Sequence, residues 1–132
     1  MVIYENYLDN ESFENNIEKI YHIDFKYIYS EPTDLQKGLM FKKNPLNDNE
    51  GALFMMPENK IQKFWMKNTY ISLDLLFLDE NGKIVGFIEN SKPFDINNYF
   101  INKESRYVIE LNSGFIKRYN IKINNYIDLS NI

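Results

Sequence analysis

Residues 70–89 carry the sequence Tyr-Ile-Ser-Leu-Asp-Leu-Leu-Phe-Leu-Asp-Glu-Asn-Gly-Lys-Ile-Val-Gly-Phe-Ile-Glu. Two apolar runs flank the dipeptide Asn81-Gly82, and both residues of such a dipeptide tolerate the positive φ of a type I′ turn. The segment therefore predicts a β-hairpin, with strands at 70–79 and 84–89. We expect a β-rich domain to be built outward from this hairpin.

Further strands are expected on both sides of the hairpin. Residues 23–29 alternate aromatic or aliphatic side chains with polar ones, as a half-buried strand does. The segment 52–56 is apolar and is expected to end at Pro57. Three more strand segments are expected at 61–66, 106–111 and 126–129. Together with the hairpin, these segments make about seven strands.

Helices are expected to be few and short. The apolar period at 13–21 predicts the first helix. Thr33-Asp-Leu-Gln36 has the spacing of a capping box, which predicts a second helix through residue 40. Asn112 is expected to cap a third helix through residue 119. The predicted fold class is α+β and β-rich: a single small domain, either a closed or curled antiparallel barrel or a sandwich, with two or three short helices.

The chain of 132 residues is long enough for one domain with a real core. We expect that domain at 23–132, preceded by an N-terminal extension at 1–22. The chain has no cysteine, which excludes disulfides, thiol nucleophiles and zinc-thiolate sites. His22 is its single histidine, which excludes a multi-histidine metal centre. We expect no metal and no cofactor.

The charge balance argues against a nucleic-acid partner. Fifteen Lys and Arg face nineteen Asp and Glu, for a net charge of −4, and the basic residues are scattered. Nucleic-acid binders usually present a basic face. No apolar run approaches the roughly 20 residues of a membrane span, and the first residues do not have the pattern of a signal peptide. We expect a soluble protein in the cytoplasm or another intracellular compartment.

Several blocks of sequence carry a recognisable signature. They are Gly38-Leu39-Met40-Phe41, Phe64-Trp65-Met66-Lys67-Asn68-Thr69, Leu73-Asp74 and Tyr107-Val108-Ile109-Glu110-Leu111. In these blocks the chain resembles domain-of-unknown-function family 192, over roughly residues 24 to 129. Family members typically have Gly-Asp before the last strand, where this chain has Asn124-Asn125. The resemblance implies a β-rich fold and a candidate site, and no activity.

Asp74 is a candidate site residue because it interrupts an apolar strand. Burying a carboxylate is costly unless it is hydrogen-bonded or paired. In a structural interpretation, Asp74 accepts hydrogen bonds from turn N–H groups or Thr69, or pairs with Lys67. In a functional interpretation, it anchors a ligand in a pocket and has a raised pKa.

The segment 65–69 holds the other candidates. The three bulky residues 64–66 cannot all face one side of a strand, so Trp65 packs under a loop or forms a wall for a ligand ring or sugar. Lys67, Asn68 and Thr69 offer a cation, an amide and a hydroxyl, which suit an anionic or carbohydrate ligand but also an ordinary capped turn. The candidate ligand-binding residues are therefore Trp65, Lys67, Asn68, Thr69 and Asp74.

Three functions are compatible with these residues. The leading hypothesis is a non-catalytic binding module with a small-molecule or carbohydrate pocket near the Trp65–Thr69 turn. The second is a structural or assembly protein that binds other protein chains through surface tyrosines and residues 1–22. The third is a hydrolase that uses two carboxylates from Asp74, Glu89 and Glu110, although solvated strand faces account better for the two glutamates. No catalytic residue is assigned, and the oligomeric state is left open.

Overall fold

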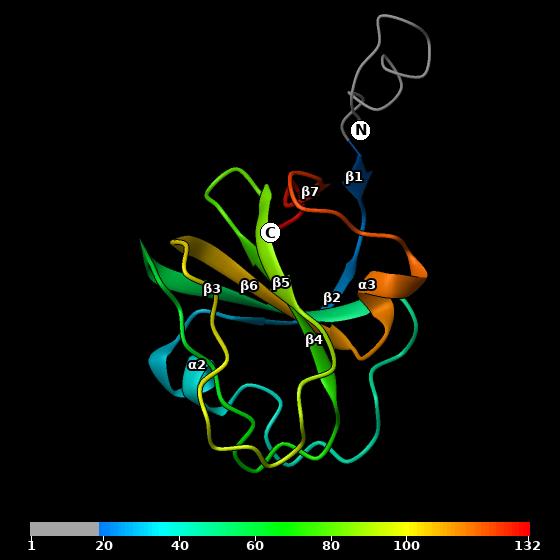
Figure 1. The fold of residues 1–132 in the computed structure, drawn as a ribbon. Helices are drawn as coiled ribbons and strands as arrows, with labels where there is room; N and C mark the ends of the chain where they lie inside the picture. The colour runs from blue at the N-terminus through cyan, green and yellow to red at the C-terminus, as the bar shows by residue number, and fades with distance from the viewer. Residues whose placement is uncertain (1–18) are drawn as a thin grey trace, which may run out of the picture.

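The structure, a computed structural model, describes residues 19–132 (Figure 1). Its strands are β1 (Ile20–Tyr21), β2 (Asp24–Tyr29), β3 (Glu50–Lys60), β4 (Leu73–Leu78), β5 (Ile84–Ile88), β6 (Ser105–Asn112) and β7 (Tyr126–Ile127). Its helices are α2 (Pro32–Lys37) and α3 (Phe115–Arg118). The described part of the chain is thus a small β-rich domain with two short helices, as the sequence predicts.

Five strands form one sheet in the order β2-β3-β6-β4-β5, and β1 pairs with β7 in a second, two-stranded sheet. The larger sheet is open at β2 and β5, so the expected barrel or sandwich is not confirmed. The expected antiparallel pairing is wrong at two places, because β2–β3 and β1–β7 are parallel. The segment with α2 between β2 and β3 is long enough for the crossover that parallel strands need.

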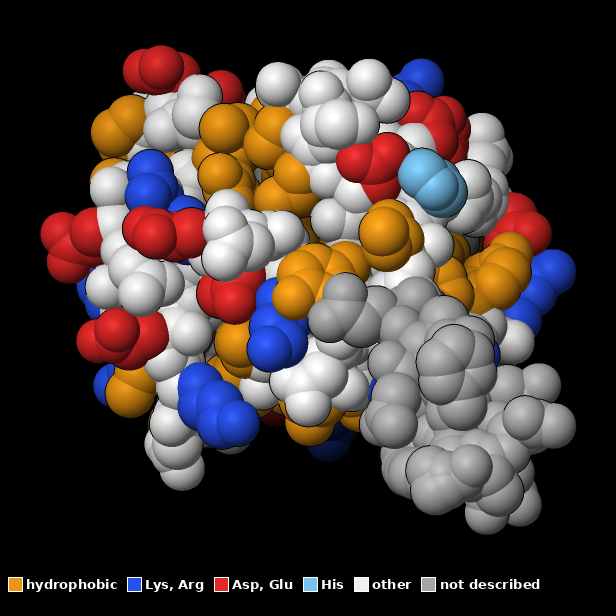
Figure 2. Space-filling view, turned by 90° about the horizontal axis from the view of Figure 1, so that it is seen from above, with side chains coloured by type: hydrophobic (Ala, Val, Ile, Leu, Met, Phe, Trp, Pro, Cys, Tyr) orange, Lys and Arg blue, Asp and Glu red, His pale blue; other side chains and the backbone are white. Residues whose placement is uncertain are grey.

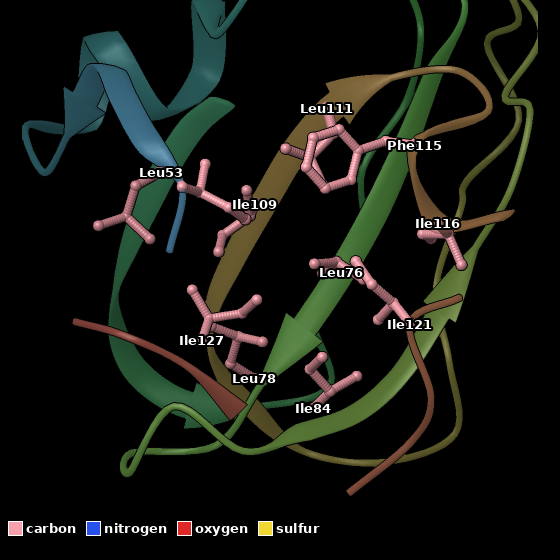
Figure 3. Packing of buried hydrophobic residues seen from close by; sticks show 11 residues of the cluster. Leu53, Leu76, Leu78, Ile84, Ile109, Leu111, Phe115, Ile116, Ile121 and Ile127 are labelled. Atoms are coloured by element: carbon pink, nitrogen blue, oxygen red, sulfur yellow. The ribbon is translucent and has the colours of Figure 1, made fainter. Parts of the chain in front are cut away.

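Both faces of the five-stranded sheet are covered. Every residue of β4 is buried, and successive side chains of a strand point to opposite faces. On one face Leu76 and Ile109 belong to one cluster with Phe115 of α3 and Ile127 of β7 (Figure 3). On the other face Phe54 and Phe77 pack below α2 and the long loops. A strand with two covered faces has a continuous apolar sequence instead of an alternating one.

The surface near β1 and β7 carries acidic and basic side chains interspersed (Figure 2). There His22 Nδ1 lies 2.9 Å from Asp128 Oδ2. Within residues 19–132, no helix is long and apolar enough to cross a membrane.

The first predicted strand is confirmed by β2, but the helix after it differs in detail. α2 begins at Pro32, which suits the first turn of a helix because it needs no N–H partner there. Thr33 therefore lies inside the helix, and the predicted capping box is wrong, since no side chain caps this end. The helix ends before Gly38, whose φ is +49°.

The segments around 52–66 also differ from the prediction. β3 continues past Pro57 to Lys60. Its pairing with β6 is irregular between Met55 and Lys60, and a proline is tolerated where the ladder needs no donor. Residues 61–66 form no strand; Phe64 makes a single bridge with Tyr99 instead.

The two other predicted helices have different outcomes. Most of the segment 13–21 lies outside the described residues, and its end at Ile20–Tyr21 is strand β1, so the predicted helix end is wrong. α3 exists, but Asn112 does not cap it. The Asn112 side chain instead exchanges two hydrogen bonds with the backbone of Leu46, at 2.6 and 2.9 Å.

The hairpin between β4 and β5 is confirmed, but its turn is not of type I′. Gly82 has φ +83° whereas Asn81 is not in the positive-φ region. Asp79 Oδ1 accepts hydrogen bonds from the N–H groups of Asn81 and Lys83, at 2.9 and 3.0 Å. A carboxylate-capped loop therefore replaces the expected two-residue turn.

Gly82→Ala is expected to lower the free energy of unfolding by about 2–3 kcal/mol. An added Cβ would lie 2.6 Å from the backbone oxygen of Ile127, on top of the strain of a positive φ. Urea unfolding measures the loss. Gly114→Ala is the matched control, because Gly114 has φ +93° with no atom within 4 Å of the added Cβ. Gly114→Ala is expected to lower the free energy of unfolding by about 1 kcal/mol. Equal losses in the two variants would show that the contact with the Ile127 oxygen adds no cost.

Candidate functional site

A cavity of about 190 Å³ lies between α2, β3, β6 and the segment 63–69. Its lining includes Phe54, Phe64, Trp65, Thr69 and Glu110, together with the end of α2 and the turn that follows it. A wider hollow of about 360 Å³ shares Trp65 with the cavity and extends to Lys67 and Asn68. Four of the five sequence-predicted residues therefore surround one continuous concave region.

The sheet and one bridge position the walls of this cavity. Phe54 on β3 and Glu110 on β6 lie on the face of the sheet toward α2, since β3 and β6 pair with Ala52 opposite Glu110. Segment 63–69 is held by hydrogen bonds between Phe64 and Tyr99, at 2.9 and 2.6 Å, and by Met66 N–H donating to the carbonyl oxygen of Asp95 at 2.8 Å.

Aromatic rings form the walls at defined angles. The ring centroids of Phe54 and Phe64 are 5.1 Å apart, with their planes at 90°. Tyr29 meets Phe54 at 5.1 Å and 62°. Trp65 is 38% exposed, and Lys67 Nζ lies 5.1 Å from the centroid of its ring. Trp65 therefore lies at the exposed end of the cavity, with the ammonium group of Lys67 over its ring.

Glu110 is the residue that the sequence analysis placed wrongly. It is 5% exposed, and a Cβ built on Gly38 would lie 4.0 Å from Glu110 Oε1. Burial raises the pKa of Glu110 to about 8, and no hydrogen bond or charge from residues 19–132 offsets that effect. The carboxyl group is therefore mostly protonated at neutral pH and lines the cavity without a hydrogen-bond partner among residues 19–132.

Tyr29 of β2 is an ionisable group close to Glu110. Burial raises the pKa of Tyr29 to about 12, with smaller contributions from Tyr27, Glu110 and Asp34. Tyr29 thus stays neutral over the working range of pH.

Asp74 does not join this group. Its side chain is fully buried, and Oδ2 accepts hydrogen bonds from the N–H groups of Gly114 and Ile116, at 3.1 and 3.0 Å. Oδ1 accepts a third from Asn90 N–H at 2.9 Å. A carboxylate that caps the first N–H groups of a helix stabilises that helix. Thr69 makes its own bond, donating to the carbonyl oxygen of Lys67 at 3.2 Å.

Sequence reasoning missed Glu110 because it assigned one solvated face to β6. Tyr107, Ile109 and Leu111 share one face, but the opposite face carries the apolar Val108 beside Glu110. Apolar residues on both faces indicate a strand buried on both sides, and that signal was available. Glu89 is exposed, as expected, and lines a separate hollow beside α3.

Within residues 19–132, no group of three or more His, Asp or Glu side chains is arranged to hold a metal ion. Glu110 is the single carboxylate that the described residues contribute to the lining of the cavity. The groups that a ligand could contact are therefore one buried acid, aromatic side chains, and the cations and amides of the rim.

Comparisons with known proteins identify relatives. A family model described as an uncharacterised ACR, domain-of-unknown-function family 192, matches residues 18–129. A solved structure from Sinorhizobium meliloti 1021, described as a candidate transcription regulator, is 29% identical with a TM-score of 0.71, over 81% of this chain and 78% of that one. A protein of unknown function from Novosphingobium aromaticivorans DSM 12444 is 29% identical with a TM-score of 0.73, over 77% and 73%. None of the curated proteins matches the chain.

Proposed function

The chain belongs to domain-of-unknown-function family 192, and on that premise we propose that it is a non-catalytic binding module. Its ligand is a small polar molecule, carbohydrates included, bound in the cavity beside the Trp65–Thr69 turn. The observation that carries this proposal is the Glu110 carboxyl group, which lines the cavity with no partner among residues 19–132.

A buried polar group without a hydrogen-bond partner destabilises a fold. Such groups cluster at functional sites, where a ligand supplies the missing partner. A concave site with apolar walls and a few convergent polar groups is the usual form of a small-molecule site. The aromatic walls and Glu110 have this arrangement, and the wider hollow at Lys67 and Asn68 gives the ligand an entrance.

Two other functions have less support. Glycoside hydrolysis usually needs two carboxyl groups about 5–10 Å apart, whereas Glu110 is the one carboxylate in the described lining. One relative is described as a transcription regulator, but the net charge of −4 of this chain disfavours contact with the phosphates of a nucleic acid. The assembly hypothesis rests on surface tyrosines and on residues 1–22, of which 1–18 lie outside the described residues.

The proposal is tested with a panel of small sugars, amines and carboxylic acids added to the ¹⁵N-labelled chain. Ligands from the panel are expected to shift the amide resonances of Gly38 and Thr69 in two-dimensional NMR spectra. Glu110→Gln is expected to weaken those ligands about tenfold or more, because it removes the acid that they contact. Glu89→Gln is the matched control at an exposed site. A panel with no ligand at Gly38 and Thr69, or equal binding by both variants, would contradict the proposal.

A further inference from the structure

The cavity combines one carboxyl group with three aromatic rings. Phe54 and Phe64 stand perpendicular to each other, with centroids 5.1 Å apart, and Trp65 closes the mouth. Glu110 lies behind them, nine-tenths buried and without a hydrogen bond from residues 19–132. The rings of Phe54 and Phe64 thus meet edge to face beside an acid.

This combination has a specific chemical preference. The faces of aromatic rings carry negative electrostatic potential, and several such faces around a cation are the usual device for recognising alkylated ammonium groups. A buried carboxylate adds a counter-ion, and its charge becomes favourable once a cation shares the site. An anionic ligand would meet ring faces that repel it and an acid that must stay protonated beside it. A neutral sugar would leave the ring faces without a charged partner.

We propose that the cavity binds the head of an alkylated ammonium compound, with Glu110 as its counter-ion and Phe54, Phe64 and Trp65 as its walls. This inference rests on the proposed function and names the ligand class for the same site. The cavity of about 190 Å³ has the volume of about six water molecules, which suits a compact head of several heavy atoms.

Charges of both signs lie at the cavity, because Lys37 and Lys63 belong to its lining together with Glu110. Two lysines near the site already lie over aromatic rings of their own: Lys67 Nζ is 5.1 Å from Trp65 and Lys63 Nζ is 5.4 Å from Phe100. The carbonyl groups of Asp34 and Lys37 at the end of α2 accept hydrogen bonds from the N–H groups of Gly38 and Met40, and the end of this helix lines the cavity. A helix C-terminus favours positive charge.

The inference has a pH signature. A quaternary ammonium ion carries a permanent charge, so the pH dependence of its binding comes from the protein. With the pKa of Glu110 raised to about 8, about one Glu110 in eleven is ionised at pH 7 and about ten in eleven at pH 9. Affinity is therefore expected to rise about tenfold from pH 7 to pH 9. Among the described residues, the other titratable or charged groups beside the site are Tyr27 and Tyr29 on β2, Asp34 and Lys37 on α2, and Lys63.

The test compares choline chloride with 3,3-dimethylbutan-1-ol, its neutral isostere of the same shape. Dissociation constants for the full chain are measured by calorimetry or NMR titration at pH 7 and pH 9. Choline is expected to bind at least tenfold more tightly than the alcohol at pH 9. Glu110→Gln is expected to reduce the difference between the two affinities and to remove the pH dependence, while Glu89→Gln changes neither.

A second variant keeps the inference falsifiable if Glu110→Gln fails to fold. Trp65→Leu removes a partly exposed ring. It is expected to weaken the binding of choline several-fold more than the binding of the alcohol. The inference is overturned if the alcohol binds as tightly as choline, if choline does not bind, or if its affinity is the same at both pH values. The proposed function survives these results when other fragments still bind at Gly38 and Thr69, and fails with them when none does.

Discussion

Replacing Glu110 with glutamine is expected to raise the free energy of unfolding at pH 9 by about 3–5 kcal/mol and to change it little at pH 5. Burial raises the pKa of Glu110 from 4.5 to about 8 in the folded chain, while the unfolded chain keeps the ordinary value. Between these values the folded state binds more protons than the unfolded state. The stability of the wild type therefore falls as the pH rises from about 4.5 to 8 and levels off above it.

Urea unfolding of the wild type and Glu110→Gln at pH 5, 7 and 9 checks this expectation. Glu89→Gln, at an exposed position directly after β5, is the control, and its stability should follow the pH profile of the wild type. Hydrogen bonds lower the pKa of Asp95 and Asp128, which removes stability only as the pH falls through the acid range, outside this window. Parallel pH profiles for the wild type and Glu110→Gln would contradict the burial of an unpartnered acid.

Asp74→Asn is expected to lower the free energy of unfolding by about 2–4 kcal/mol. The carboxylate accepts three backbone hydrogen bonds, from Asn90, Gly114 and Ile116. An asparagine keeps one acceptor oxygen and turns an NH₂ donor toward N–H groups that are donors themselves. The change leaves buried donors unsatisfied and removes the negative charge at the start of α3.

Denaturant unfolding measures this loss, and Asp79→Asn is a matched control. Asp79 also accepts backbone hydrogen bonds, from Asn81 and Lys83, but in a hairpin loop where water replaces them. Asp79→Asn is expected to lower the free energy of unfolding by about 1 kcal/mol. Amide exchange of Gly114 and Ile116 should accelerate in Asp74→Asn alone. Equal losses for the two variants, with unchanged exchange, would show that the buried cap adds no stability.

Elements specified by local patterns could be predicted from the sequence. The hairpin of β4 and β5 and the alternating strand β2 are confirmed, because turn chemistry and period-2 alternation act over a few residues. The segment 61–66 has the same β-prone composition but forms a single bridge with Tyr99. Its neighbours are determined by the fold as a whole, and strand propensity depends strongly on such neighbours.

The residues of the candidate site were likewise predictable only where they are close together in the sequence. Trp65, Lys67, Asn68 and Thr69 surround one concave region because they are adjacent in sequence. Glu110 comes to that region through the register of β6, opposite Ala52 on β3 and Leu75 on β4, and a sequence pattern does not specify register between distant strands. Asp74 lies on β4 but serves α3, 40 residues away along the chain at Gly114.

We infer that Glu110, an acid without a hydrogen-bond partner among residues 19–132, lies in a cavity that binds a cationic head. A ¹³C NMR titration of the Glu110 side-chain carboxyl group, without and with saturating choline, tests it most directly. We expect a pKa of about 8 in the free chain and a lower pKa with choline bound, because an adjacent cation favours the carboxylate. An ordinary carboxyl pKa in the free chain, or a raised pKa that choline leaves unchanged, would contradict the account.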